Sequence, residues 1–120
     1  MTKLLDKKVK GYILWEIQNY PASQQWLANN NNKQRIDGTA RKFRERRQQV
    51  VEAIDAALQE ADPEQVEAVS LIYWKKLYNA AGAGFQIGAS ERTVYRWIDQ
   101  VVYTVAAKMG LLEGEERRIG

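Results

Sequence analysis

Residues 78–109, YNAAGAGFQIGASERTVYRWIDQVVYTVAAKM, decide how this chain folds. They combine a short segment of small residues, a glycine-centred turn and a longer amphipathic segment. Small side chains at 80–84 let a second helix approach closely, and Phe85 is expected to fill the space between the two helices as an apolar plug. Gly88 can adopt the positive φ of a sharp reversal, and Ser90 stands where a hydroxyl caps a helix. The stretch therefore predicts two crossed helices joined by a tight turn.

The second of these helices is expected to begin at Glu91 and to end before Gly110. Its apolar residues recur at spacings of three and four, which places them on one face of a helix. This predicted buried stripe consists of Val94, Ile98, Val101, Val105, Met109 and Leu112.

The opposite face of its first turns carries side chains suited to reading DNA. Arginine fits guanine edges and phosphates, and threonine or tyrosine can contact a thymine methyl group. In a helix-turn-helix, the start of the second helix enters the major groove. The candidate base-reading residues are Ser90, Glu91, Arg92, Thr93, Tyr95, Arg96 and, at the margin, Gln100. The alternative is a plain helical hairpin, which has the same pattern in other all-α domains.

Charge is segregated along the chain, which carries 18 Lys and Arg against 15 Asp and Glu, a net charge of +3. Residues 33–47 hold seven basic side chains against two acidic ones, whereas acidic residues dominate 48–78. Such separation favours one surface for phosphates and another for a protein partner. Alternatively, the basic run has no ligand and is only the solvent-exposed start of a helix. Basic residues at a helix N-terminus, however, interact unfavourably with the helix dipole. The candidate phosphate-binding residues are Lys33, Arg35, Arg41, Lys42, Arg44, Arg46 and Arg47.

Several function classes are disfavoured by composition. The chain has no cysteine and no histidine, which removes disulfides, thiolate catalysis, zinc-finger ligation and histidine acid–base chemistry. The glycines of 82–88 do not follow a strand and lack the spacing of a nucleotide loop. No apolar run approaches the roughly 20 residues that span a bilayer. We therefore expect no enzyme, no metal, no cofactor and no membrane partner, and a cytoplasmic protein.

The region before the helix-turn-helix predicts two further helices. After Gly38, Thr39 is expected to cap a long helix, and Asp62-Pro63-Glu64-Gln65 is a capping-box restart for a helix that runs to about Leu77. No alternating pattern indicates a strand. The buried stripe expected for the long helix is Phe43, Val50 or Val51, Ile54, Leu58 and Ala61.

These patterns together predict an all-α fold: a small helical bundle with a C-terminal helix-turn-helix and an N-terminal helix joined by an Asn-rich loop. Asn19 and Pro21 are expected to end the N-terminal helix, and the polar run Asn29–Asn32 lacks a sustained period. The expected division is an N-terminal helix at 1–20, a loop or hinge at 21–38, a helical DNA-binding domain at 39–112 with the helix-turn-helix at 78–109, and a tail at 113–120.

Two segments give the chain a family resemblance. They are VSLIYWKKL at 69–77, an aromatic-rich helix ahead of the reading unit, and IGASERTVYR at 87–96, with its turn followed by Ser-x-Arg-Thr-hydrophobic-x-Arg. Across residues 60–112 the arrangement resembles the ArpU/RinA-type regulators of bacteriophages, whose C-terminal half resembles region four of sigma factors. The resemblance implies a sequence-specific activator of phage late genes, binding double-stranded DNA at a promoter and contacting RNA polymerase in the bacterial host cytoplasm.

Two matters stay open at this point. A small-terminase-like subunit for phage DNA packaging also joins a helix-turn-helix to helical oligomerisation segments, although such subunits usually place the reading unit first. The N-terminal helix can either pair with a second copy, giving a homodimer, or fold back on its own core.

Overall fold

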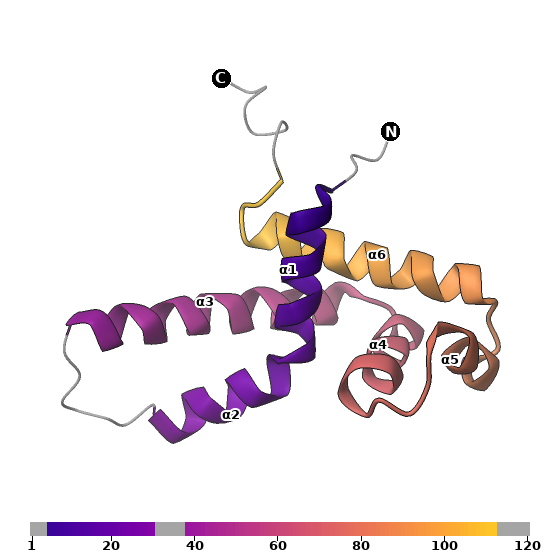
Figure 1. Ribbon diagram of the computed structural model, residues 1–120, viewed down its shortest axis with the longest axis horizontal. Helices are drawn as coiled ribbons and strands as arrows, with labels where there is room; N and C mark the ends of the chain where they lie inside the picture. The colour runs from indigo at the N-terminus through magenta and orange to yellow at the C-terminus, as the bar shows by residue number, and fades with distance from the viewer. Residues whose placement is uncertain (1–4, 31–37, 113–120) are drawn as a thin grey trace.

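The computed structural model describes residues 5–30 and 38–112, and every secondary-structure element in those ranges is a helix (Figure 1). The all-α prediction is confirmed. The helices are α1 (Lys7–Gln18), α2 (Tyr20–Asn30), α3 (Gly38–Glu60), α4 (Pro63–Val69), α5 (Ala80–Ile87) and α6 (Glu91–Lys108), with a π-helical turn η1 (Ser70–Trp74) continuing α4. Across these ranges, no helix has the length and apolar character needed to cross a bilayer.

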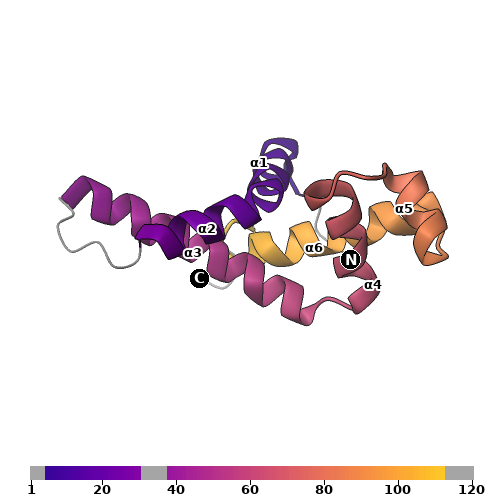
Figure 2. The same cartoon turned by 90° about the horizontal axis from the view of Figure 1, so that it is seen from below.

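Helix α6 is the centre of the fold, because α1, α3, α4 and α5 all pack against it (Figures 1 and 2). The predicted stripe is confirmed: Val94 and Val105 are fully buried, and Met109 and Leu112 also contact the core. Val102 and Ala106 are fully buried as well. The buried arc is wider than the sequence pattern indicates, since partners cover α6 on more than one side.

Helix α1 folds back on the core of its own chain, which is one of the two arrangements expected for it. Asp6 caps it by accepting a hydrogen bond from the Lys8 amide at 2.7 Å, and Asn19 ends it. Ile13 and Ile17 are fully buried against the rest of the core. The isoleucine side of this helix is therefore covered within the molecule, whereas Trp15 is 55% exposed.

The loop expected at 21–38 is wrong for its first part, because residues 20–30 form helix α2. Residues 31–37 lie outside the described ranges. Helix α2 buries only Tyr20 and Ser23, so it has no apolar period that the sequence could reveal. It is held by contacts with α3: the Tyr20 hydroxyl donates to Asp55, and Trp26 packs edge-on against Phe43 with ring centroids 5.3 Å apart. Pro21 lies in the first turn of this helix, where a missing amide costs no helical hydrogen bond.

Helix α3 forms an elongated arm with α2 at one end of the molecule (Figure 1). Its predicted stripe is correct from Val50 onward, with Val50, Val51 and Ile54 buried and Leu58 and Ala61 packed at the core edge. Phe43 is the exception, with 53% of its surface exposed. It lies where α3 has left the core and only α2 remains beside it.

The restart at Asp62 is confirmed: helix α4 begins at Pro63, and the Gln65 side chain accepts from the Asp62 amide at 3.0 Å. The helix does not continue to Leu77 as expected. It widens into η1, where the Lys75 amide donates to the Ser70 carbonyl at 2.8 Å, and helical structure ends at Trp74. The Trp74 indole N–H then donates to the Ile17 carbonyl at 2.8 Å, which attaches this turn to α1.

Candidate nucleic-acid interface

The turn between α5 and α6 has the geometry that the sequence predicts. Gly88 adopts the left-handed conformation at φ 93°, and its amide donates to the Gly84 carbonyl at 2.7 Å. Ser90 caps α6 by accepting from the Thr93 amide at 3.1 Å, and the two hydroxyls lie 3.0 Å apart. Ser90 and Thr93 therefore also build the start of the candidate reading helix.

Close packing of the two helices depends on Gly84. A β-carbon at this position would lie 2.5 Å from the Ala89 carbonyl oxygen and 3.2 Å from the Val94 side chain. Gly84, Ala80 and Ala83 are buried and form the face of α5 turned to the core. Phe85 is not an apolar plug, because 83% of its surface is exposed. It follows Gly84 directly, and each helical residue turns by about 100°, which carries Phe85 off the buried face.

The exposed face of the first turns of α6 centres on Arg92 and Arg96. They are four residues apart, so they lie one above the other on the same face. Both side chains are exposed, and within the described ranges neither forms an ion pair. Glu91 is exposed beside them, and Tyr95 is 54% exposed. These four side chains are open to a partner.

Gln100 lies at the edge of this face and is tied to the bundle. Its side-chain oxygen accepts a hydrogen bond from the Gln65 amide group of α4 at 2.5 Å.

The other edge of the face is bordered by α1 and η1. Lys10 of α1 forms an ion pair with Asp99 of α6, with Nζ and Oδ1 2.7 Å apart. Burial raises the pKa of the Tyr73 phenol, and the nearby Tyr95 and Asp99 raise it further. The sequence did not predict that α1 and η1 lie next to this face, since no local pattern links residues so far apart in the chain. The only available signal was the basic run at the start of α1.

The seven predicted phosphate-binding residues differ in their exposure, and two of them lie outside the described ranges. Lys33 and Arg35 lie outside the described ranges. Arg41, Lys42 and Arg46 are exposed on α3, and Arg44 is half-buried with its Nε buried and lacking a hydrogen-bond partner among the described residues.

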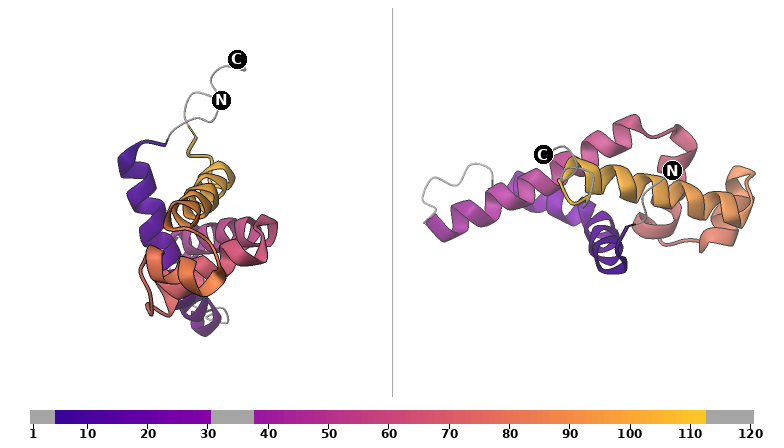
Figure 3. Two further views of the ribbon diagram at one scale, coloured as in Figure 1. Left: turned by 90° about the vertical axis from the view of Figure 1, so that its right-hand side faces the viewer. Right: turned by 90° about the horizontal axis from the view of Figure 1, so that it is seen from above.

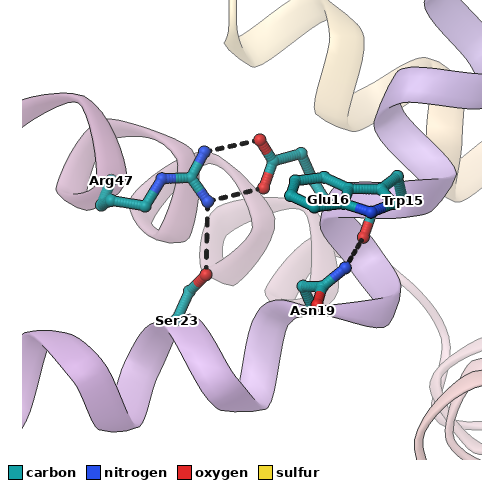
Figure 4. Close-up of polar contacts among 5 residues, drawn as sticks. All are labelled: Trp15, Glu16, Asn19, Ser23 and Arg47. Atoms are coloured by element: carbon teal, nitrogen blue, oxygen red, sulfur yellow. Dashed lines mark hydrogen bonds and ion pairs between the residues drawn. The ribbon is translucent and has the colours of Figure 1, made fainter. Parts of the chain in front are cut away.

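Arg47 is used inside the protein, which removes it from the phosphate-binding set. Its guanidinium donates to both carboxylate oxygens of Glu16, at 2.9 and 2.6 Å, and to the Ser23 hydroxyl at 3.3 Å (Figure 4). Only 15% of its side chain is exposed, and 1% of Glu16. Burial alone would raise the pKa of the Glu16 carboxyl, but the hydrogen bonds from Arg47 and Tyr12 lower it below its usual value. A buried carboxylate needs such a partner, and Arg47 supplies it.

The basic end of α3 and the start of α6 lie at opposite ends of the molecule, whose longest extent is 50 Å (Figures 1 to 3). In Figure 1, α3 begins at the left and the turn between α5 and α6 lies at the right, and the other views agree. The basic end of α3 is therefore not next to the groove that α6 would enter.

Acidic side chains of the segment 48–78 are exposed on α3 and α4. They include Glu52, Glu64 and Glu67. Glu60 is exposed too, but it is paired with Lys108, with Oε2 and Nζ 2.5 Å apart. Among the described residues, no group of histidine, cysteine, aspartate or glutamate side chains has an arrangement that could hold a metal ion.

Comparisons with models of protein families, with curated proteins and with solved structures gave no match to this chain.

Proposed function

We propose that this chain is a sequence-specific DNA-binding transcriptional regulator that reads the major groove with the first turns of α6. One observation carries the proposal: Arg92 and Arg96 project from one exposed face, directly after a turn that is capped by Ser90 and closely packed at Gly84. A fixed helix start with unpaired arginines matches the demands of base-edge recognition, which needs defined side-chain origins and free donors.

The roles within the face follow from its geometry. Arg92 and Arg96 donate to guanine edges or to the adjacent phosphates, and Tyr95 lies beside them to contact a thymine methyl group. Ser90 and Thr93 contribute chiefly by fixing the helix start, because their hydroxyls already bond to each other and to the first turn. Gln100, held by Gln65, marks the limit of the reading face.

The finer proposal is an activator of phage late genes of the ArpU/RinA type, acting with host RNA polymerase. Support comes from the resemblance of residues 60–112 and from the separation of surfaces: the exposed glutamates of α3 and α4 stay open to a protein while α6 engages DNA. A single reading helix of this size buries little surface, so a dimer or a polymerase contact would raise its affinity.

The test is binding of the purified full chain to DNA fragments from its own genomic neighbourhood at two salt concentrations. We expect one fragment to be preferred, and Arg92→Ala and Arg96→Ala each to abolish that preference at a cost of roughly 1–3 kcal/mol. Arg41→Ala is the matched control, because Arg41 is an exposed arginine near the start of α3, at the opposite end of the molecule from the start of α6.

Equal binding to all fragments, unchanged by the α6 variants, would contradict the proposal and favour a packaging subunit. In that case the oligomeric state becomes decisive, since a small terminase forms a higher ring and a regulator a monomer or dimer.

A further inference from the structure

Helix α1 lies across α6 on the molecular surface. In Figure 1, α1 crosses the C-terminal half of α6 steeply, and Figure 3 shows the two helices next to each other from other directions. Their contact includes the ion pair between Lys10 and Asp99, at 2.7 Å. Asp99 lies three residues after Arg96 and seven after Arg92, so it belongs to the same side of α6. The ion pair therefore places Lys10 of α1 about one helical turn beyond Arg96, next to the end of the proposed reading face.

The position of α1 is fixed by three kinds of contact. Ile13 and Ile17 are buried in the core, Glu16 pairs with Arg47 of α3, and the Ile17 carbonyl accepts from the Trp74 indole. All three lie in the C-terminal half of the helix, and in the N-terminal half Val9 packs against the core but is only partly buried. A rigid attachment of this kind presents the first turns of α1 at a constant place relative to α6.

The first turns of α1 are basic. Lys7 precedes Lys10 by three residues, so both lie on the side of α1 that meets Asp99. Lys7 and Lys8 are exposed, and neither has an ion-pair partner in the described ranges. Asp6, the nearby carboxylate, is tied to the Lys8 amide as the helix cap. Free positive charge beside a reading helix is what a phosphate at the groove edge attracts.

Asp99 has the wrong charge for a surface that approaches DNA. An unpaired carboxylate one turn beyond Arg96 would repel the phosphate backbone. Its pairing with Lys10 neutralises it and directs it toward α1. Lys10 would therefore favour DNA binding by neutralising Asp99, whereas Lys7 can contact a phosphate itself.

We propose that α1 forms a second DNA-contacting element, in which Lys7 binds a backbone phosphate at the edge of the groove read by α6, and Lys10 removes the repulsion from Asp99. This inference rests on the proposed function, because it assumes that α6 enters the groove. It assigns α1 a role in DNA binding besides its role in folding.

The first test measures the salt dependence of binding for the preferred fragment and for an unrelated one. Lys7→Ala should weaken binding to both fragments alike, keep the preference between them, and reduce the slope of log K against log salt by about one. Lys42→Ala is the control, because the basic end of α3 lies at the opposite end of the molecule from the groove that α6 would enter, and it should leave the slope unchanged. A wild-type slope for Lys7→Ala would overturn the phosphate contact.

The second test is a double-mutant cycle on the ion pair. Lys10→Met should weaken binding by exposing Asp99, Asp99→Asn should strengthen it, and Lys10→Met in the Asp99→Asn background should have no more than a small effect. An equal loss in both backgrounds would mean that Lys10 contacts phosphate itself, and would overturn the neutralising role. Helix content and thermal unfolding of each variant show whether the fold is retained.

An Arg96→Ala arm separates the two proposals. If Arg96→Ala abolishes the preference while Lys7→Ala behaves as wild type, only the role of α1 fails. If no fragment is preferred and Arg96→Ala has no effect, the proposed function fails, and the role of α1 with it.

Discussion

Helices α3 and α6 both carry arginines that a DNA-binding protein could use, yet the two helices employ them differently. On α6, Arg92 and Arg96 stand exposed at a closely packed turn, without ion-pair partners in the described ranges. On α3, Arg47 is turned inward to Glu16 and Ser23, and it joins α3 to α1 and α2. Basic residues are more numerous on α3, and some of them are exposed there, but Arg47 is used within the fold whereas both arginines of α6 face solvent. The partner that each side chain meets decides its role, and the charge count does not.

The strongest test of this contrast is the removal of Arg47. Arg47→Met leaves the Glu16 carboxylate buried without its partner, so we expect the free energy of unfolding to fall by about 3 kcal/mol or more. Chemical denaturation measures it. Arg46→Met, one residue away and exposed, should change the free energy by less than about 0.5 kcal/mol.

A double variant separates lost charge pairing from lost packing. Arg47→Met with Glu16→Leu should recover most of the stability, because apolar residues of similar volume can replace a buried pair. Equal stabilities of Arg47→Met and Arg46→Met would show that the internal role of Arg47 is unimportant.

The next test concerns the support under the α6 arginines. Gly84→Ala places a β-carbon 2.5 Å from a backbone oxygen, which must move, and we expect a loss of about 1–3 kcal/mol in unfolding free energy together with loss of DNA preference. Gly82→Ala is the control in the same helix. Its β-carbon meets mainly the Tyr78 ring, at 2.9 Å, and that exposed side chain can move aside. A larger loss for Gly82→Ala than for Gly84→Ala would contradict the close approach at Gly84.

A smaller effect is expected from acid, because protonation changes the charge of Glu16 and keeps its side chain in place. The folded-state pKa of Glu16 lies below its ordinary value of 4.5, so the ion pair stabilises the fold at pH values above that unfolded-state pKa. That stability is lost as the pH falls through this range toward the lower folded-state pKa. The stability difference between wild type and Glu16→Gln should therefore shrink as the pH is lowered from about 6 to below 4. A constant difference would contradict the ionised pair.

The smallest effect is expected for the reading face itself. Arg92→Ala and Arg96→Ala should each change the unfolding free energy by less than about 0.5 kcal/mol, because exposed side chains without partners contribute little to stability. The same denaturation experiment measures this. A loss near that of Arg47→Met would show that these arginines also serve the fold.

Local sequence patterns correctly predicted the features that depend on residues close together in the chain. The Asp62 restart, the left-handed Gly88, the Ser90 cap and the buried stripe of α6 each depend on residues within one or two helical turns. These features were enough to obtain the all-α fold and to locate the exposed face of α6.

The sequence failed where structure depends on partners that are distant in the chain. Helix α2 has no apolar period of its own and is held through Tyr20, Ser23 and Trp26 by α3. The pairing of Arg47 with Glu16 spans 31 residues, and that of Lys10 with Asp99 spans a still longer stretch. Neither the internal use of Arg47 nor the location of α1 beside the reading face could be obtained from spacing alone.

The π-helical turn at Ser70–Trp74 has a consequence for how this chain can vary in length. Its hydrogen bond from Lys75 to Ser70 encloses one residue more than an α-helical turn does. Deleting a single residue here would restore ordinary helical geometry and rotate Trp74 by about 100° away from the Ile17 carbonyl. It would also change the direction in which the chain leaves toward α5. A change of length in this turn is therefore expected to alter both the attachment of α1 and the direction in which α5 and α6 continue.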